Sequence, residues 1–354
     1  MMDIANIKKI FQNADFHHQI KHKFGKYKSF VPDSIQQLRA SSKSIIYKLD
    51  ISTELGIQPI IFKRYIGSKN RNNVEINLYD KAHPFLKEFM PTIYATKSKI
   101  FDNETWMLIE YIEPLRGRIH PPNHFDYIIP TVAKLHAHSY EQNFYDNIDL
   151  FNPWFPTFHS KKAKTRRQAK IQKTKLYLID ALHHKRLKKI IEPTHSIIQQ
   201  ILSKSSLSFP ELVQNGQCIV HGDLHLQNIC CNHINQNTNN HIRMIDWESA
   251  RFASGWFDIN LLVERYLGLR NSEKNNDDSI RNHCVQLYTT EMNKRGITFQ
   301  SDPMILYKMS YLQYLLETGL LVQLQKEFDG KKGVLLTYYL DKVLNWGKEL
   351  NLYS

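Results

Sequence analysis

The apolar residues in the first third of the chain change from helical spacing to short stretches that are typical of strands. Residues 1–30 are predicted to be helical because apolar side chains recur at helical spacing, at Ile4, Ile7, Ile10 and Phe11. Strands are predicted where short stretches rich in β-branched and aromatic residues lie between polar turns, at 34–40, 44–51, 60–65, 93–96 and 106–111. Apolar residues four apart predict a helix over 72–85. The pattern indicates a small β-rich lobe with one inserted helix.

After Pro114 the apolar spacing becomes mainly helical. Helices are predicted at 128–138, 196–203, 259–267, 278–294, 303–328 and 333–350. Residues 218–220 lead into a loop, and a hairpin is predicted after it, 229–231 with 242–245, whose tip is rich in Asn. The order predicts an α+β fold with two lobes. They are a β-rich N-terminal nucleotide-binding lobe, 1–112, and a mainly helical C-terminal lobe, 113–354, which holds the catalytic loop and the acceptor site.

Composition favours a folded, reduced protein. The chain has 354 residues, of which 42% are hydrophobic and 23% charged, so a globular core is expected. No segment is long and apolar enough for a membrane span, and residues 1–20 lack a signal-peptide pattern. The four cysteines form no Cys-x-x-Cys pair. We therefore expect a cytoplasmic location, and we interpret Cys230 and Cys231 as core residues rather than metal ligands.

The net charge of +13 is concentrated in one segment. Residues 161–189 contain twelve Lys or Arg and a single acid, Asp180, so this segment carries +11 and the rest of the chain +2. The segment is expected to be helical, and three readings stay open. It is a solvated face, a site for an anionic substrate such as a phosphorylated sugar, or a surface for nucleic acid or a membrane. Because the positive charge is confined to this segment, the charge balance of the whole molecule does not favour nucleic acid as a partner.

The most specific chemistry lies in one loop and the hairpin after it. Residues 221–228 read His-Gly-Asp-Leu-His-Leu-Gln-Asn, and Asp246 follows eighteen residues after Asn228. An Asp, an Asn five residues later and a second Asp beyond a hairpin are the spacing of phosphoryl-transfer enzymes. A carboxylate at Asp223 orients a hydroxyl and accepts its proton. Asn228 and Asp246 offer the hard oxygen ligands that Mg²⁺ prefers.

These residues, with Ile-Asp-Trp-Glu at 245–248 and Trp-Phe-Asp-Ile at 256–259, resemble the aminoglycoside phosphotransferase and choline kinase family. The resemblance covers most of the chain, is strongest over 220–262, and implies the protein-kinase-like fold. It implies that Asp223 is the catalytic base, that Asn228 and Asp246 bind magnesium, and that Asp258 braces the catalytic loop.

The same region departs from protein kinases. Gly222 stands where a protein kinase has an Arg that pairs with a phosphorylated activation loop. Asp-Trp-Glu replaces Asp-Phe-Gly, and an Ala-Pro-Glu segment is lacking. The sequence therefore argues against a phospho-regulated protein kinase.

The N-terminal lobe supplies candidates for nucleotide binding. Lys63 lies within an apolar strand, which suits a lysine that reaches the nucleotide phosphates. Glu75 is its expected partner in the following helix, and Asp80 is the substitute.

Two further segments are expected to contact the nucleotide. The turn 41–43 contains no glycine, so Ser42 is the candidate donor to a phosphate. Glu110 and Ile112, in the connector 110–113, should present backbone groups to the adenine edge. The cofactors expected are ATP and Mg²⁺, with GTP as an alternative nucleotide.

The sequence thus predicts an ATP-dependent small-molecule kinase that phosphorylates an acceptor hydroxyl. One alternative is an antibiotic phosphotransferase of the aminoglycoside type that confers resistance. A basic segment beside the pocket would repel such polycations. The other alternative is an inactive nucleotide-binding regulator, against which the complete set of site residues argues. The acceptor and the oligomeric state are left open.

Overall fold

The chain folds into two compact units. The computed structural model describes Ile7, Phe11, Ile20 and residues 27–66, 73–98, 105–115, 123–203, 209–232, 241–270 and 276–353. Unit 1 comprises Met1–Leu115, Asp149–Trp154 and Gln227–Ser249. Unit 2 comprises Arg116–Ile148, Phe155–Leu226 and Ala250–Ser354. Asn228 and Asp246 therefore belong to unit 1, and Asp223 belongs to unit 2.

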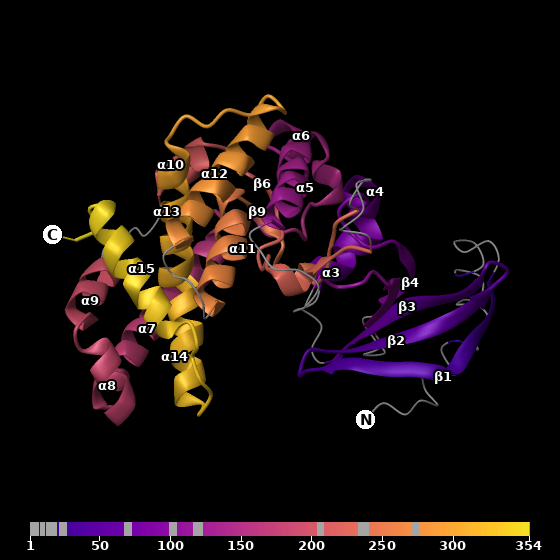
Figure 1. The fold of residues 1–354 in the computed structure, drawn as a ribbon, viewed down its shortest axis with the longest axis horizontal. Helices are drawn as coiled ribbons and strands as arrows, with labels where there is room; N and C mark the ends of the chain where they lie inside the picture. The colour runs from indigo at the N-terminus through magenta and orange to yellow at the C-terminus, as the bar shows by residue number, and fades with distance from the viewer. Residues whose placement is uncertain are drawn as a thin grey trace. The chain divides into compact units, whose positions relative to one another are not determined.

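Unit 1 is built on an antiparallel sheet of five strands in the order β1-β2-β3-β5-β4 (Figure 1). The strands are β1 (Tyr27–Ala40), β2 (Ser44–Thr53), β3 (Gly56–Tyr65), β4 (Ile93–Ser98) and β5 (Thr105–Glu110). All five predicted strands are present, but β1 begins at Tyr27, so the prediction of helix is wrong for 27–30. Pairing with β2 from Tyr27 onward outweighs the local pattern.

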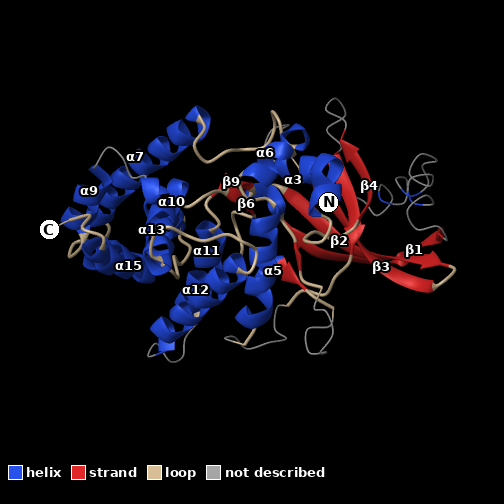
Figure 2. Ribbon diagram, turned by 90° about the horizontal axis from the view of Figure 1, so that it is seen from above, coloured by secondary structure: helices blue, strands red, loops and turns tan. Residues whose placement is uncertain are grey.

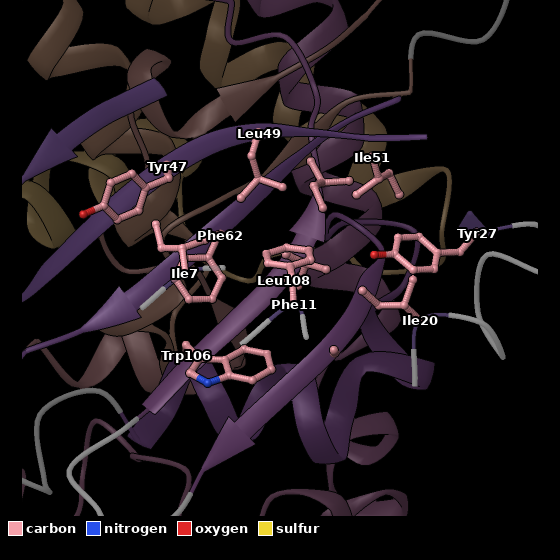
Figure 3. Close-up of a cluster of buried hydrophobic side chains, with 12 residues drawn as sticks. Ile7, Phe11, Ile20, Tyr27, Tyr47, Leu49, Ile51, Phe62, Trp106 and Leu108 are labelled. Atoms are coloured by element: carbon pink, nitrogen blue, oxygen red, sulfur yellow. The ribbon is translucent and has the colours of Figure 1, made fainter. Parts of the chain in front are cut away.

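One face of this sheet carries the core of unit 1 (Figure 3). Tyr47, Leu49 and Ile51 alternate along β2 and are buried, as the two-residue period of a strand requires. Ile7, Phe11 and Ile20 are helical, and all three are buried in the same cluster. Ile4 and Ile10 of the predicted N-terminal helix lie outside the described residues.

The helix predicted over 72–85 forms with a π turn in its middle. It consists of α3 (Asn73–Asn77), η1 (Leu78–Ala82) and α4 (His83–Leu86). The predicted hairpin also forms, as β7 (Ile229–Cys230) and β8 (Arg243–Met244). It joins the rest of unit 1 through Leu115, whose N–H donates to Ile229, and through Met244, whose N–H donates to Phe89.

Unit 2 is mainly helical (Figure 2). Its helices are α5 (Phe125–His138), α6 (Gln142–Asp146), α7 (Lys161–His183), α8 (Lys185–Ile191), α9 (His195–Ser203), α10 (Pro210–Gln214), α11 (Trp256–Leu269), α12 (Asp277–Asn293), α13 (Pro303–Tyr314), α14 (Leu320–Phe328) and α15 (Leu336–Glu349). The helix predicted over 303–328 is interrupted by the π turn η6 (Leu315–Gly319). A two-stranded sheet pairs β6 (Cys218–Val220) with β9 (Arg251–Ala253). None of the described helices has the length and apolar character that crossing a membrane requires.

A buried polar network fixes α11 within unit 2. Glu264 on α11 accepts from Arg281 Nε on α12 at 2.6 Å. It also accepts from Tyr307 on α13 and Tyr338 on α15, each at 2.5 Å. Because a buried charge is tolerated only where it is paired and hydrogen-bonded, this network holds the four helices in one arrangement. Helix α11 carries Asp258, the residue expected to brace the catalytic loop.

Candidate active site

A buried lysine joins three elements of unit 1. The side chain of Lys63 on β3 is only 7% exposed, and its Nζ donates to Glu75 Oε2 at 2.7 Å and to Asp246 Oδ1 at 2.9 Å. Burial by itself lowers the pKa of Lys63, but the charges of Glu75 and Asp246 outweigh it and raise the pKa above its ordinary value. Lys63 is therefore a fixed positive charge at neutral pH.

Glu75 is held on two sides. Besides Lys63, the hydroxyl of Tyr65 donates to Glu75 Oε2 at 2.8 Å. Burial raises the pKa of Glu75, and the charge of Lys63 opposes that rise. The structure thus brings Glu75 to Lys63, whereas Asp80 lies exposed on η1. Sequence reasoning missed Tyr65, although its place two residues after Lys63 puts it on the same strand face.

Asp246 has a backbone conformation that is uncommon for a residue with a side chain. Its φ is 67°, in the left-handed region, which costs a non-glycine residue on the order of 1–2 kcal/mol. Its Oδ2 lies 3.9 Å from Arg39 Nη1, in addition to the Lys63 contact of Oδ1. Backbone strain of this kind persists where the surroundings over-determine a position, as they do at functional sites.

The hairpin brings Asn228 close to Asp246. Asn228 is buried, and its carbonyl accepts from the N–H of Ile245 at 2.9 Å, next to Asp246 in the chain. The next pair along the hairpin is Ile229 with Met244. Both candidate metal ligands therefore lie at the same end of the β7–β8 ladder.

The donor set fits a magnesium ion that the protein and the phosphates of a nucleotide bind together. Asn228 and Asp246 offer an amide oxygen and a carboxylate, and phosphate oxygens and water would supply the remaining ligands. Within the described ranges, no group of three or more His, Cys, Asp or Glu could hold a metal alone. Cys230 and Cys231 are buried, and burial raises the pKa of Cys230 to about 12, with Cys231 adding to the rise. This thiol is thus neutral and packed in the core.

The turn between β1 and β2 is organised by Ser41. The Ser41 hydroxyl accepts from the N–H groups of Lys43 at 3.2 Å and Ser44 at 3.1 Å. Ser42 is exposed at the turn. Lys43 Nζ donates to Glu248 Oε1 at 2.5 Å, a contact that the sequence did not indicate because the residues are 205 positions apart.

The connector after β5 leaves backbone groups available. Glu110 is tied to Thr92, whose carbonyl accepts from the Glu110 N–H at 2.9 Å. Beyond it, the N–H of Cys231 donates to the carbonyl of Glu113 at 2.9 Å. Ile112, between these anchored points, bonds through its backbone to no other residue in the part of the chain that the structure describes. Its N–H and C=O can therefore serve the edge of a planar ring.

In unit 2, Asp258 braces the loop that carries Asp223. Asp258 Oδ2 accepts from the N–H of His221 at 2.7 Å, and Oδ1 accepts from the N–H of Gly222 at 2.8 Å. Asp258 Oδ2 also lies 3.2 Å from His136 Nε2 on α5. Burial raises the pKa of Asp258, but the hydrogen bond and charge of His136 lower it more, so its pKa lies below the usual range. The positive φ of Gly222, 80°, explains the glycine at this position.

Asp223 is a half-exposed carboxylate with two basic neighbours. Arg265 Nη1 on α11 donates to its Oδ1 at 3.1 Å, and His225 Nε2 lies 3.7 Å from its Oδ2. Burial raises the pKa of Asp223, but His225, Arg265 and His221 lower it below its ordinary value. Asp223 is therefore ionised at neutral pH and able to accept a proton. Sequence reasoning missed Arg265, although its place seven residues after Asp258 puts both on one face of α11.

Comparison with known proteins places the chain in a family. The model of the ecdysteroid kinase-like family matches residues 57–294. This range includes the candidate residues from Lys63 to Arg265, whereas Arg39 and the β1–β2 turn, 41–43, precede it. The chain belongs to the ecdysteroid kinase-like family. No protein with a curated functional description matches this member of the family.

Solved structures show the fold. A choline kinase from Cryptosporidium parvum is 18% identical, with a TM-score of 0.56 and 90% of each chain covered. This likeness confirms the predicted two-lobed, α+β protein-kinase-like fold. Two others match with TM-scores of 0.48. A Plasmodium vivax ethanolamine kinase is 14% identical, covering 89% of this chain and 82% of its own. The amicoumacin kinase hAmiN, in complex with AMP-PNP, Ca²⁺ and Ami, is 13% identical, covering 90% and 94%.

Proposed function

We propose that this protein is a kinase that transfers the γ-phosphoryl group of ATP to a hydroxyl group of a small molecule. The observation that carries the proposal is the contact of buried Lys63 with buried Glu75 and partly buried Asp246, because it combines a permanent cation with a carboxylate that suits a divalent metal. Membership of a kinase-like family supports a small-molecule kinase over an unrelated nucleotide-binding protein.

The nucleotide is assigned to the N-terminal lobe, 1–112, and to the metal ligands of the hairpin. Lys63 would neutralise charge on the phosphates, with Glu75 holding its side chain in place. Asn228 and Asp246 would hold the magnesium ion, which when bound neutralises charge on the β- and γ-phosphates. Ser42 is assigned to the phosphates, and the backbones of Glu110 and Ile112 to the adenine edge, where GTP is the alternative.

The acceptor is assigned to the C-terminal lobe, 113–354, with Asp223 as base. The acceptor oxygen attacks the γ-phosphorus while the bond from that phosphorus to the bridging oxygen of ADP breaks. The hydroxyl proton passes to the Asp223 carboxylate, which Arg265 and His225 keep ionised. Asp258 holds the backbone of the loop so that Asp223 keeps one position.

The acceptor class is the open part of the function. The family name points to an ecdysteroid, and the structural relatives are named for choline, ethanolamine and amicoumacin. The second candidate function is an antibiotic-modifying phosphotransferase. An activity screen that includes antibiotics among the acceptors tests this candidate.

The test separates nucleotide binding from transfer. We expect Asp223→Asn to bind magnesium-ATP in calorimetry as the unmodified protein does, while transfer to any acceptor found by screening falls by roughly 100-fold or more, since the base is lost. We expect Asp246→Ala to weaken magnesium-dependent ATP binding itself. Asp80→Asn is the matched control, because this carboxylate lies exposed on η1. Full turnover by Asp223→Asn would reject the base, and absence of magnesium-ATP binding in the unmodified protein would favour an inactive regulator.

A further inference from the structure

We propose that the acceptor carries a phosphate group, which unit 2 binds through Arg251 and Lys170. The inference rests on the proposed function and narrows its acceptor to a phosphorylated alcohol. It gives a role to part of the basic segment, which the transfer chemistry does not use.

Arg251 lies next to the loop of the base. It is the first residue of β9, where it pairs with Val220, the last residue of β6. Paired residues in an antiparallel ladder have Cα atoms about 5 Å apart. Asp223 follows Val220 by three residues. Arg251 is partly exposed as a residue, and the Nε atom of its guanidinium is buried.

Helix α7 brings further cations to Arg251. The segment that leads into α7 pairs with β9, since the N–H of Phe158 donates to the carbonyl of Phe252 at 2.9 Å. The Arg167 guanidinium carbon lies 3.8 Å from the centre of the Phe158 ring, and that of Arg251 lies 5.9 Å from the same ring. The two guanidinium groups therefore share one aromatic ring.

The positively charged side chains around Arg251 outnumber the acidic side chains near them. Arg167 is paired with Glu317, its Nε lying 3.0 Å from Oε1. Lys170 is exposed, and its Nζ donates to a neutral group, Thr318 Oγ1, at 3.2 Å. Burial lowers the pKa of Lys170, Arg251, Arg166 and Arg167 lower it further, and Glu317 opposes them. Asp258 and Glu317 act in the same way on Arg251. A cluster with this imbalance gains stability from an added anion.

One tyrosine relates the cluster to the base. Burial raises the pKa of Tyr314, Asp223 raises it further, and Arg265 and Arg251 oppose the rise. The Tyr314 hydroxyl is thus within electrostatic reach of the base and of Arg251. Glu317 and Thr318, which contact α7, follow Tyr314 by three and four residues, which is one turn of helix. A small molecule bound near Tyr314 can therefore meet both groups.

A phosphate ester suits this arrangement. Guanidinium and ammonium groups bind phosphate oxygens through short, charge-assisted hydrogen bonds, and a dianion matches several cations at once. A polycationic acceptor would be repelled by the same groups. The reaction is the one already proposed: a free hydroxyl of the phosphorylated alcohol attacks the γ-phosphorus, its proton passes to Asp223, and ADP leaves.

The first test compares neutral alcohols with their phosphate esters. Glycerol and glycerol 3-phosphate, ribose and ribose 5-phosphate, and glucose and glucose 6-phosphate are offered with magnesium-ATP, and ADP release is measured. We expect the phosphorylated member of a pair to have the higher kcat/KM. We expect Lys170→Gln to raise its KM about tenfold, the effect of one charge-assisted hydrogen bond, with little change in kcat. Lys162→Gln, which removes an exposed charge from the same helix, should change neither.

A second measurement does not depend on guessing the alcohol. Inorganic phosphate is titrated into the protein saturated with magnesium-ADP, so that the nucleotide site is filled. We expect saturable binding that Lys170→Gln weakens and Lys162→Gln does not. The proposal is overturned if neutral alcohols react as well as their esters, or if phosphate does not bind. It is also overturned if both variants weaken binding equally, or if an oligonucleotide or anionic vesicles bind where phosphate does not. Magnesium-ATP binding in the same samples shows separately whether the proposed function stands.

Discussion

At the scale of residues, the candidate site is defined by how charges are paired. Lys63 is stabilised by two carboxylates, while Asp223 is a carboxylate stabilised by Arg265 and His225. The charge of each group is thus set by its partners, as expected for a cation that meets phosphates and a base that must be ionised. Burial alone would lower the pKa of Lys63.

The Arg265–Asp223 pair leads to a prediction about pH. A base with a lowered pKa stays ionised until the pH falls through that pKa, where kcat/KM declines. Arg265→Gln removes a group that lowers the pKa of Asp223, so the pKa should rise and the acid limb of the kcat/KM profile should move to higher pH. Arg265→Lys, which keeps a charge, should move the limb less.

The control for this prediction is an arginine that pairs with a different acid. Arg186 on α8 pairs with Glu327, and Arg186→Gln should leave the pH profile unchanged. An unchanged acid limb in Arg265→Gln, together with a fall in kcat at every pH, would mean that Arg265 only positions the carboxylate.

At the scale of elements, the loop of the base is held by helices from distant parts of the chain. Asp258 on α11 accepts from the loop backbone, His136 on α5 lies against Asp258, and Tyr288 on α12 lies 2.9 Å from His136 Nδ1. These contacts fix the position of the loop, and Gly222 gives it the turn it needs.

Gly222→Ala is expected to displace the base without disturbing the nucleotide. The left-handed φ of 80° costs an alanine about 1–2 kcal/mol, and the strain falls between two backbone groups that Asp258 binds. We expect kcat to fall by roughly tenfold or more, in line with that energy, with KM for ATP unchanged. Gly296→Ala is the matched control, because its φ is 79° and an added Cβ meets nothing within 4 Å. It should lower the melting temperature but not kcat, and equal losses of kcat in both would refute the argument.

The elements also show what the sequence could predict. The strands of unit 1 and the helices of unit 2 follow from apolar spacing, because each element buries one face. Strand β9 was missed because three residues are too few to show the two-residue alternation of a strand. Its structure depends on pairing with β6. Lys63 was found from its position in an apolar strand, Glu75 from its position in the following helix, and Asp258 from the family motif. Arg265 and Arg251 were missed because their roles depend on contacts across the fold.

At the scale of the whole molecule, the residues of the proposed site are divided between the two units. Lys63, Glu75, Asn228 and Asp246 lie in unit 1, whereas Asp223 and the cations that we assign to the acceptor lie in unit 2. The loop 221–228 crosses from one unit to the other, so a few residues of chain connect the base to the metal ligand. Ligands of the two kinds should therefore stabilise different units.

Hydrogen exchange measured by mass spectrometry tests this division. A ligand that binds only the folded state stabilises it by about 2.7 kcal/mol at a concentration of 100 Kd, and this slows exchange in the segments that it holds. Magnesium with a non-hydrolysable ATP analogue should protect β3, α3 and the β7–β8 hairpin, with little change in α12 and α15. Asp246→Ala should remove that protection, because it removes the proposed ligand of the metal and a partner of Lys63. Glucose 6-phosphate, added to the protein saturated with magnesium-ADP, should instead protect β9 and the first turns of α7. Protection of unit 2 alone by the nucleotide would place its site elsewhere and reject the assignment of Lys63.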